Sequence, residues 1–240
     1  MAWCGIPGTY AEEALAPVDR LVAIPDGIST QQAAAAILQG MTAHYLVYST
    51  FVPKSGDTIL IHAGAGGTGL LLIQLAKRLG VRVITTVSTE AKATLARAAG
   101  ADEVILYTQE DVVARVKVLT NGAGLPVVYD SVGKTTFEQS LQCLRPRGTL
   151  VLFGGASGAV PPFDLIRLST MGSLYVTRPT LKDYVATRED LEQRAGDIFR
   201  WVADGSLKLR IEHTYPLTEA AQAQRELESR KTTGKLLLLP

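Results

Sequence analysis

The sequence predicts a doubly wound α/β (Rossmann) fold with a six-stranded parallel sheet. Between residues 58 and 176, six short runs rich in apolar and β-branched residues alternate with segments of helical spacing. The runs are almost continuously apolar, which is typical of parallel strands covered by helices on both faces of a sheet. A glycine-rich segment at residues 62–69 separates the first run from the first of these helices, as in dinucleotide-binding domains.

The composition excludes several classes of protein. The 240 residues are 47% hydrophobic and 20% charged, which suits a globular chain of one large or two modest domains. The 24 lysines and arginines balance 23 aspartates and glutamates, so the basic excess needed for electrostatic nucleic-acid binding is missing. No apolar run has the length of a membrane-spanning helix, and the first residues lack the pattern of a signal peptide. We therefore expect a cytoplasmic protein that neither binds nucleic acid nor inserts into a membrane.

The chain before the regular alternation is predicted to form two short strands followed by helices. Turn residues bound the strands, which are expected at residues 8–13 and 21–25. Ser29, with Gln32 three residues later, has the spacing of a helix capping box. A helix is expected to follow until Gly40 breaks it, before a second helical stretch over residues 41–51.

The alternating region and the end of the chain supply the other elements. The strands of the parallel sheet are expected at residues 58–62, 81–87, 103–106, 127–130, 149–153 and 174–176. The helices between them are expected at residues 68–79, 90–99, 112–119 and 135–143. The last part of the chain predicts helices at residues 188–201 and 218–229 and strands at residues 207–213 and 236–239.

The glycine-rich segment is a candidate phosphate-binding turn. The spacing Gly64-x-Gly66-x-x-Gly69 matches the dinucleotide fingerprint and can also be read from Ala63. Glycines there let the backbone approach a pyrophosphate, and the helix N-terminus offers unpaired N–H groups. A purely structural turn is the alternative. The strand before the turn and the helix after it favour a cofactor.

The end of the second strand indicates which cofactor binds. NAD sites usually carry an acidic residue at this point, whereas residues 85–89 read TTVST. Glu90 falls inside the next helix, where it complements the helix dipole. Ser88 and Lys92 offer a hydroxyl and a cation that suit a 2′-phosphate, so NADP is favoured over NAD. A solvated helix lysine is the alternative for Lys92.

Three further strand ends face the same crevice in this architecture. Tyr107 follows the third strand and could lie along the adenosine, or be a packed edge aromatic. Ser131 and Phe153 follow the fourth and fifth strands and are placed to touch the ribose and the nicotinamide. Asp130 is expected to hold its own loop.

Several catalytic patterns are missing from the sequence. It has no Tyr-x-x-x-Lys, no Gly-x-Ser-x-Gly and no metal-ligand spacing among its histidines, His44, His62 and His213. Each histidine is therefore interpreted as a structural residue with its hydrogen bonds satisfied, and Cys143 as helix packing. We expect no metal site, and Cys4 and Cys143 cannot form a disulfide framework.

With these residues in place, the chain resembles the zinc-independent, zeta-crystallin-like quinone oxidoreductases of the medium-chain dehydrogenase/reductase superfamily. The matching segments run in order along essentially the whole chain. They are residues 40–45 (GMTAHY), 61–69 (IHAGAGGTG), 85–92 (TTVSTEAK), 128–133 (VYDSVG), 152–154 (LFG), 157–158 (SG), 175–179 (YVTRP) and 234–236 (GKL).

The resemblance implies that NADPH is the cofactor and that hydride passes from it to a quinone, in some members as a one-electron process. The implied cofactor-binding residues are Thr42, Tyr45, Ala65, Gly66, Gly67, Thr68, Ser88, Lys92, Tyr107, Ser131, Phe153, Gly154, Thr177, Arg178 and Lys235. No side chain need act as a nucleophile, because the cofactor carries the chemistry. Tyr45 alone is a candidate for positioning substrate, and helix packing is its equal alternative.

The sequence departs from the family at its beginning. In the family a β-rich, GroES-like catalytic domain precedes the nucleotide domain. We expect residues 1–30 to be a remnant of that domain and residues 31–180 to be the NADP-binding Rossmann domain. Residues 181–240 are expected to form helices and return strands that pack towards the catalytic domain. The quinone pocket is then either reduced or lost, or completed in another way.

The resulting hypothesis is an NADPH-dependent quinone oxidoreductase that acts on a quinone or a similar small electrophilic acceptor. The family suggests a homodimer that pairs through the sixth strand, around residues 174–176. Two alternatives stay open. One is an activated-alkene (enoyl) reductase on the same scaffold, and the other is a non-catalytic NADPH-binding protein, which the short N-terminal part favours.

Overall fold

The computed structural model describes residues 1–5, 7–229 and 232–240, which form two compact units. The helical unit comprises Met1–Tyr45, Gly66–Leu71 and Leu181–Pro240. The sheet unit comprises Leu46–Ala65 and Leu72–Thr180. The helix α2 (Gly67–Arg78) begins in the first unit and ends in the second.

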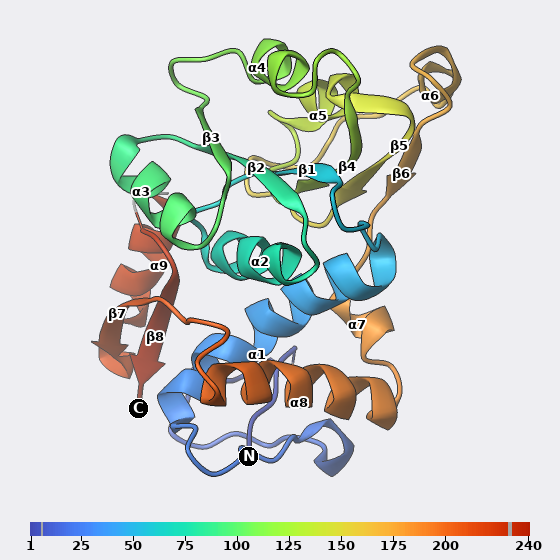
Figure 1. Ribbon diagram of the computed structural model, residues 1–240. Coiled ribbons are helices and arrows are strands. Elements are labelled where there is room, and N and C mark those ends of the chain that lie inside the picture. The colour runs from blue at the N-terminus through green and yellow to red at the C-terminus, as the bar shows by residue number, and fades with distance from the viewer. Residues whose placement is uncertain (6, 230–231) are drawn as a thin grey trace. The chain divides into compact units, whose positions relative to one another are not determined.

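The sheet unit contains the predicted six-stranded parallel sheet (Figure 1). Its strands are β1 (Thr58–Ile61), β2 (Arg82–Val87), β3 (Glu103–Leu106), β4 (Leu125–Asp130), β5 (Leu144–Leu152) and β6 (Tyr175–Thr177). Their order is β3-β2-β1-β4-β5-β6, and every pair of neighbours is parallel. Since the order reverses beside β1, the carboxyl ends of β1 and β4 flank the point where this architecture binds ligands.

Both faces of the sheet are buried, as the apolar runs predict. The consecutive residues Ile59, Leu60 and Ile61 of β1 point alternately to opposite faces, and all three are 0% exposed. Besides α2, which joins β1 to β2, the connecting helices are α3 (Glu90–Ala98), α4 (Val112–Leu119), α5 (Phe137–Gln142) and α6 (Ile166–Thr170). Figure 1 shows α4 and α5 together over one face of the sheet. The predicted doubly wound fold is therefore confirmed.

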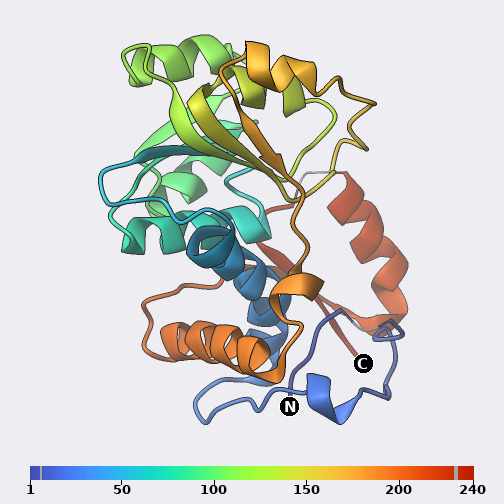
Figure 2. The same ribbon diagram turned by 90° about the vertical axis from the view of Figure 1, so that its right-hand side faces the viewer.

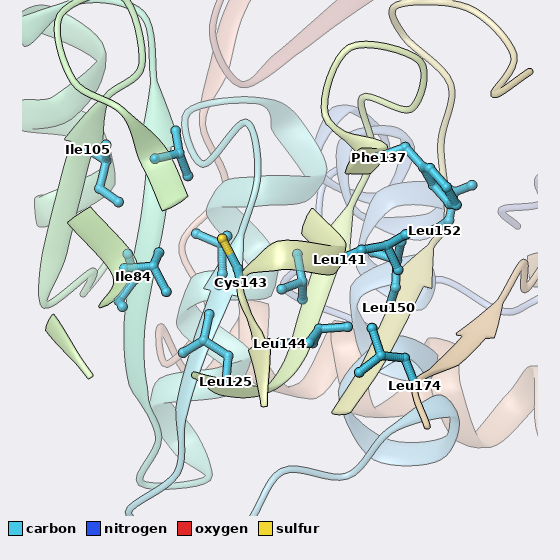
Figure 3. Packing of buried hydrophobic residues seen from close by; sticks show 14 residues of the cluster. Ile84, Ile105, Leu125, Phe137, Leu141, Cys143, Leu144, Leu150, Leu152 and Leu174 are labelled. Carbon is cyan, nitrogen blue, oxygen red and sulfur yellow. The ribbon is translucent and has the colours of Figure 1, made fainter. Parts of the chain in front are cut away.

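An apolar cluster fills the space between the sheet and the helices α4 and α5 (Figure 3). Its members are Leu60, Ile84, Ile105, Val112, Val116, Leu125, Val128, Phe137, Leu141, Cys143, Leu144, Leu150, Leu152 and Leu174. Cys143 is 1% exposed within it, which confirms its interpretation as a packing residue. Because the cluster includes Leu152 at the end of β5, it fixes the strand end from which a candidate site loop departs.

The helical unit pairs two long helices and a small parallel sheet. The helices α1 (Thr30–Tyr45) and α8 (Arg188–Ala203) pack against each other and are seen in blue and orange in Figure 2. The strands β7 (Ile211–Pro216) and β8 (Lys235–Leu239) form the parallel pair. The remaining helices are α7 (Leu181–Tyr184) and α9 (Ala220–Glu228).

The predicted break at Gly40 is wrong, because α1 continues through it to Tyr45. Gly40 serves packing instead: a Cβ at this position would lie 2.8 Å from Cγ2 of Ile198 on α8. The capping box is confirmed. The backbone N–H of Gln32 donates to Oγ of Ser29, and the backbone N–H of Ser29 donates to Oε1 of Gln32. A π-helical turn, Leu46–Thr50, follows α1.

The strands predicted at residues 8–13 and 21–25 are also wrong. In the described part of this segment, the only strand-like feature is an isolated antiparallel bridge between Ala2 and Val22. A 3-10 turn, Val18–Arg20, begins directly after Pro17. Residues 8–13 have no partner strand in the described part of the chain, and Pro25, which ends the second segment, has no N–H to donate to a ladder.

A search of the described residues for a helix long and apolar enough to span a bilayer finds none.

Candidate functional site

The glycine-rich turn after β1 is held tightly against β2. A Cβ on Gly64 would lie 2.1 Å from Oγ1 of Thr85, so only glycine fits there. The Gly64 N–H donates to the Thr86 carbonyl at 3.1 Å, and Ala63 has a positive φ of 56°. The turn therefore brings bare backbone to the carboxyl edge of the sheet, which is the geometry that lets a pyrophosphate approach closely.

The end of β2 carries no acidic side chain. Ser88 and Lys92 are half-buried there, in the loop and in the first turn of α3. Thr89 caps that helix by accepting a hydrogen bond from the Lys92 N–H. Glu90 is turned to another partner, an exposed ion pair with Arg97 at 3.3 Å. The feature that favours a 2′-phosphate in the sequence, a hydroxyl and a cation without a carboxylate, is thus present in the structure.

Asp130 holds the loop after β4, as expected. The carboxylate is 0% exposed and accepts hydrogen bonds from the Val132 and Gly133 N–H groups at 2.8 and 3.0 Å. The hydroxyls of Thr136 and Ser140 donate to it at 2.7 and 2.8 Å. Four donors around one buried carboxylate fix the course of the loop on which Ser131 lies.

The loops after β4, β5 and β6 converge within the sheet unit. A Cβ on Gly154 would lie 2.3 Å from the Ser131 carbonyl oxygen, so these two backbones touch. The Phe153 N–H donates to the Asp130 carbonyl at 2.9 Å. Arg178, which follows Thr177 at the end of β6, donates to the Leu152 carbonyl at 3.1 Å. The structure therefore brings together Ser131, Phe153, Gly154, Thr177 and Arg178.

Tyr107 lies apart from these loops, after β3. The residue is 52% exposed, which argues against the packed edge aromatic that was its alternative. Its N–H donates to the Val87 carbonyl at 3.2 Å, so it adjoins the end of β2.

Of the remaining predicted residues, Ala65 is buried in the sheet unit, and the others lie in the helical unit. Gly66 pairs in a parallel bridge with Gly234, which precedes Lys235, and Gly67 starts α2. A hollow at this helix N-terminus is lined by Ala35, Gln39, Gly67, Leu70, Leu71, Leu209, Arg210, Gly234 and Lys235. Burial lowers the pKa of the Lys235 ammonium. A cation beside a helix N-terminus suits an anionic group.

Sequence reasoning missed Gln39 as part of this hollow. A Cβ on Gly67 would lie 2.4 Å from Oε1 of Gln39, so the absence of a side chain at Gly67 makes room for the amide. No sequence spacing points to Gln39, because its partner lies 28 residues further along the chain and across a strand.

Thr42 and Tyr45 lie on α1. The Thr42 hydroxyl donates to the Leu38 carbonyl at 2.7 Å. Tyr45 is 2% exposed and stacks on Tyr184, with ring centroids 4.3 Å apart and planes at 12°. The stack is what the helix-packing interpretation of Tyr45 predicts. A role of Tyr45 in positioning substrate stays a prediction.

His62 is buried and hydrogen-bonded at both ring nitrogens, as the structural interpretation requires. Nδ1 lies 3.0 Å from Oγ1 of Thr86, and Nε2 lies 3.0 Å from Oγ of Ser140. Burial lowers the pKa of His62, and the nearby Asp130 carboxylate only partly opposes this. The order His–Ser–Asp does not match a nucleophilic triad, in which the carboxylate orients the histidine and the histidine activates the serine. Sequence alone gave no signal for Ser140, which lies 78 residues from His62.

Across the part of the chain that the structure describes, no group of three or more His, Cys, Asp and Glu side chains is arranged to hold a metal ion.

Several known proteins are similar to this chain in sequence and in structure. The model of the zinc-binding dehydrogenase family matches residues 67–196. A quinone oxidoreductase of Pseudomonas aeruginosa is 50% identical over 233 residues, 97% of this chain and 72% of that protein. A 2-haloacrylate reductase of a Burkholderia species is 41% identical over 236 residues, 97% of this chain and 71% of the relative. The structure of Escherichia coli quinone oxidoreductase complexed with NADPH is similar, with a TM-score of 0.91 and 46% sequence identity. The match covers 92% of this chain and 69% of the Escherichia coli chain.

Proposed function

The chain belongs to the zeta-crystallin-like quinone oxidoreductase family of the medium-chain dehydrogenase/reductase superfamily, and on that premise we propose that it is an NADPH-dependent quinone oxidoreductase. The observation that carries the proposal is the edge of the sheet, where the Gly64 turn lies beside a β2 end without a carboxylate. A turn that a Cβ would fill fits a pyrophosphate, and Ser88 with Lys92 fits a 2′-phosphate. Relatives named quinone oxidoreductase support quinone as the acceptor.

The proposed cofactor contacts are those that the resemblance implies, with residues 31–180 as the cofactor-binding part of the chain. NADPH would supply the hydride, and the protein would orient the nicotinamide and exclude water. Asp130 holds the Ser131 loop rigid, and Gly154 lets the loop after β5 lie directly against it. Phe153 adds a half-buried apolar side chain, and its N–H donates to the Asp130 carbonyl. Arg178 is held at the end of β5 by the Leu152 carbonyl.

Turnover assays test this proposal directly. The purified chain is titrated with NADPH, followed by the cofactor fluorescence, and NADPH oxidation is then measured with a benzoquinone, a naphthoquinone and an enone. Saturable NADPH binding and oxidation with a quinone are expected. Binding of NADPH without turnover of any acceptor would contradict the proposed activity and indicate a non-catalytic NADPH-binding protein.

One observation favours a second candidate, an activated-alkene reductase. The 2-haloacrylate reductase is 41% identical to this chain, not far below the quinone oxidoreductases. The same hydride donor can reduce a polarised carbon–carbon double bond. Turnover of the enone alone, with no quinone reduced, would establish this second function in place of the first.

We also propose that the chain forms a homodimer through β6. This strand is the edge of the sheet, and Tyr175 and Val176 on it are 61% and 38% exposed. An exposed strand edge is a template for pairing with another chain. Analytical ultracentrifugation should show a dimer for the natural chain and a monomer for Tyr175→Lys, which puts a charge on the exposed edge strand.

A cytoplasmic location is part of the proposal. Cys4 and Cys143 are both free thiols, which suits a reducing compartment. Fractionation of cells that express the protein, followed by its detection in each fraction, checks the location.

A further inference from the structure

A chain of buried hydrogen bonds links the glycine-rich turn to the loop after β4. The Ala63 N–H donates to Oγ1 of Thr86 at 3.3 Å, and this hydroxyl lies 3.0 Å from Nδ1 of His62. Nε2 of His62 lies 3.0 Å from Oγ of Ser140. The Ser140 hydroxyl then donates to Oδ2 of Asp130 at 2.8 Å. Three of the four side chains are at most 1% exposed, and Thr86 is 2% exposed.

The donors and acceptors of this chain determine the direction of every bond. Ser140 has one hydroxyl hydrogen, and it is given to Asp130, because the carboxylate can only accept. Oγ of Ser140 must therefore accept from His62, which places the imidazole hydrogen on Nε2. Nδ1 is then free to accept from the Thr86 hydroxyl, whose oxygen accepts in turn from Ala63. Burial lowers the pKa of His62, so the ring carries a single hydrogen at neutral pH and all donors point toward Asp130.

Each end of this chain fixes a loop that carries proposed cofactor contacts. At one end, Thr86 holds Ala63, whose positive φ of 56° opens the Gly64 turn. At the other end, Asp130 holds the Val132 and Gly133 N–H groups and thus the loop of Ser131. The first loop suits a pyrophosphate, and the second suits the ribose and nicotinamide. The two loops follow neighbouring strands, β1 and β4.

We propose that His62 and Ser140 are positioning residues that couple the phosphate-binding Gly64 turn to the Ser131 loop after β4. Each half of the dinucleotide is then bound correctly only when both loops are in place. This inference rests on the proposed function, because it assumes that the two loops bind NADPH. Both side chains are buried, His62 at 1% and Ser140 at 0% exposed, so their proposed role is indirect. Their effect is to transmit the position of one loop to the other through a rigid, fully satisfied polar chain.

The decisive experiment measures an effect across the length of the cofactor. Ser140→Ala breaks the chain on the nicotinamide side, and its affinity is measured for NADPH and for 2′-phospho-ADP, which lacks both the second ribose and the nicotinamide. Coupling predicts that Ser140→Ala weakens both ligands at least five-fold. An effect on NADPH alone would overturn the proposal, since it would show a local role.

The complementary substitution tests the other direction. Thr86→Val removes the hydroxyl on the turn side and should lower kcat/KM for reduced nicotinamide mononucleotide, which has no adenosine half. Thr86→Ser keeps the hydroxyl and should restore the natural value. The double variant Ser140→Ala/Thr86→Val should lose little more NADPH affinity than either single variant, because the chain is already broken. Independent, multiplicative losses would contradict the coupling.

A matched control and a spectroscopic measurement complete the test. Cys143→Ala removes a comparable buried atom one turn along from Ser140 but takes no part in the polar chain, so it should leave both affinities unchanged. Nitrogen NMR of the natural chain should show the Nε2–H tautomer for His62. This measurement does not depend on whether a variant folds. An Nδ1–H tautomer would overturn the assigned direction. If the natural chain binds neither NADPH nor 2′-phospho-ADP, the proposed function fails and this inference falls with it.

Discussion

Nδ1 of His44 accepts a hydrogen bond from the Arg194 guanidinium at 3.1 Å. An arginine can only donate, so the ring hydrogen of the neutral imidazole lies on Nε2, which is 3.0 Å from Oδ2 of Asp197. Arg194 also donates to the Tyr184 carbonyl at 2.8 Å, and Tyr184 stacks on Tyr45. The helices α1, α7 and α8 are thus joined by a buried polar network that requires a neutral histidine.

This network predicts acid-sensitive stability. Burial lowers the pKa of His44, the Asp197 hydrogen bond raises it, Arg194 lowers it, and the net pKa lies below its ordinary value. The unfolded chain therefore binds more protons below about pH 6.5, so stability falls as the pH falls from there toward the lower folded pKa. Urea unfolding between pH 8 and pH 5.5 should show this loss, with a slope of at most about 1.4 kcal/mol per pH unit from His44. The slope should be shallower in His44→Gln, and equal slopes would contradict the assignment.

Gly40→Ala should destabilise the chain despite the better helix propensity of alanine. The added Cβ would lie 2.8 Å from the Ile198 side chain, and overpacking of this kind costs about 1–3 kcal/mol. The gain in propensity offsets about 1 kcal/mol of that cost. Urea unfolding of Gly40→Ala, Ile198→Ala and the double variant forms a cycle. The double variant should be more stable than the sum of the single effects, because Ile198→Ala removes the clash.

Gly40 also illustrates which part of the fold the sequence could predict. The six strands and their helices follow from periodicity and strand length, which are local properties, and all six strands are present. Gly40 looks like a helix breaker by local propensity, whereas its role depends on Ile198, which is 158 residues away in sequence. The short strands expected before Pro25 failed for a related reason: β preference needs a partner strand, and only Val22 finds one.

The candidate site divides in the same way. The Gly64 turn and the acid-free end of β2 are visible in the sequence because a dinucleotide turn is defined by spacing along one segment. The partners of His62 were not predictable, since Thr86 and Ser140 lie on other elements and meet it only in the folded sheet unit. Asp130 was correctly expected to hold its loop, because a carboxylate two residues before a backbone N–H is a local arrangement.

Gly64→Ala should abolish tight NADPH binding. Its Cβ would lie 2.1 Å from Oγ1 of Thr85, which itself donates to the Ile61 carbonyl at 2.6 Å and cannot move without breaking that bond. We expect the turn to shift and the NADPH dissociation constant, measured by fluorescence titration, to rise more than about ten-fold, or about 1.4 kcal/mol. Gly196→Ala is the matched control, because its Cβ would meet nothing within 4 Å. Unchanged affinity in Gly64→Ala would argue against a phosphate at this turn.

Lys92→Ala should weaken NADPH far more than NADH. Lys92 lies half-buried in the first turn of α3, next to the acid-free end of β2, where the 2′-phosphate of NADPH is proposed to bind. Loss of a charge-assisted hydrogen bond to that phosphate costs about 1–3 kcal/mol of binding free energy. NADH has no 2′-phosphate, so its affinity should not change. Titration of both cofactors into the natural chain, Lys92→Ala and the control Lys117→Ala, whose exposed lysine lies on α4, measures the difference. Since screening weakens exposed charge pairs, the preference for NADPH should also shrink with added salt. Equal affinity of the natural chain for NADH and NADPH would refute the role of both Ser88 and Lys92.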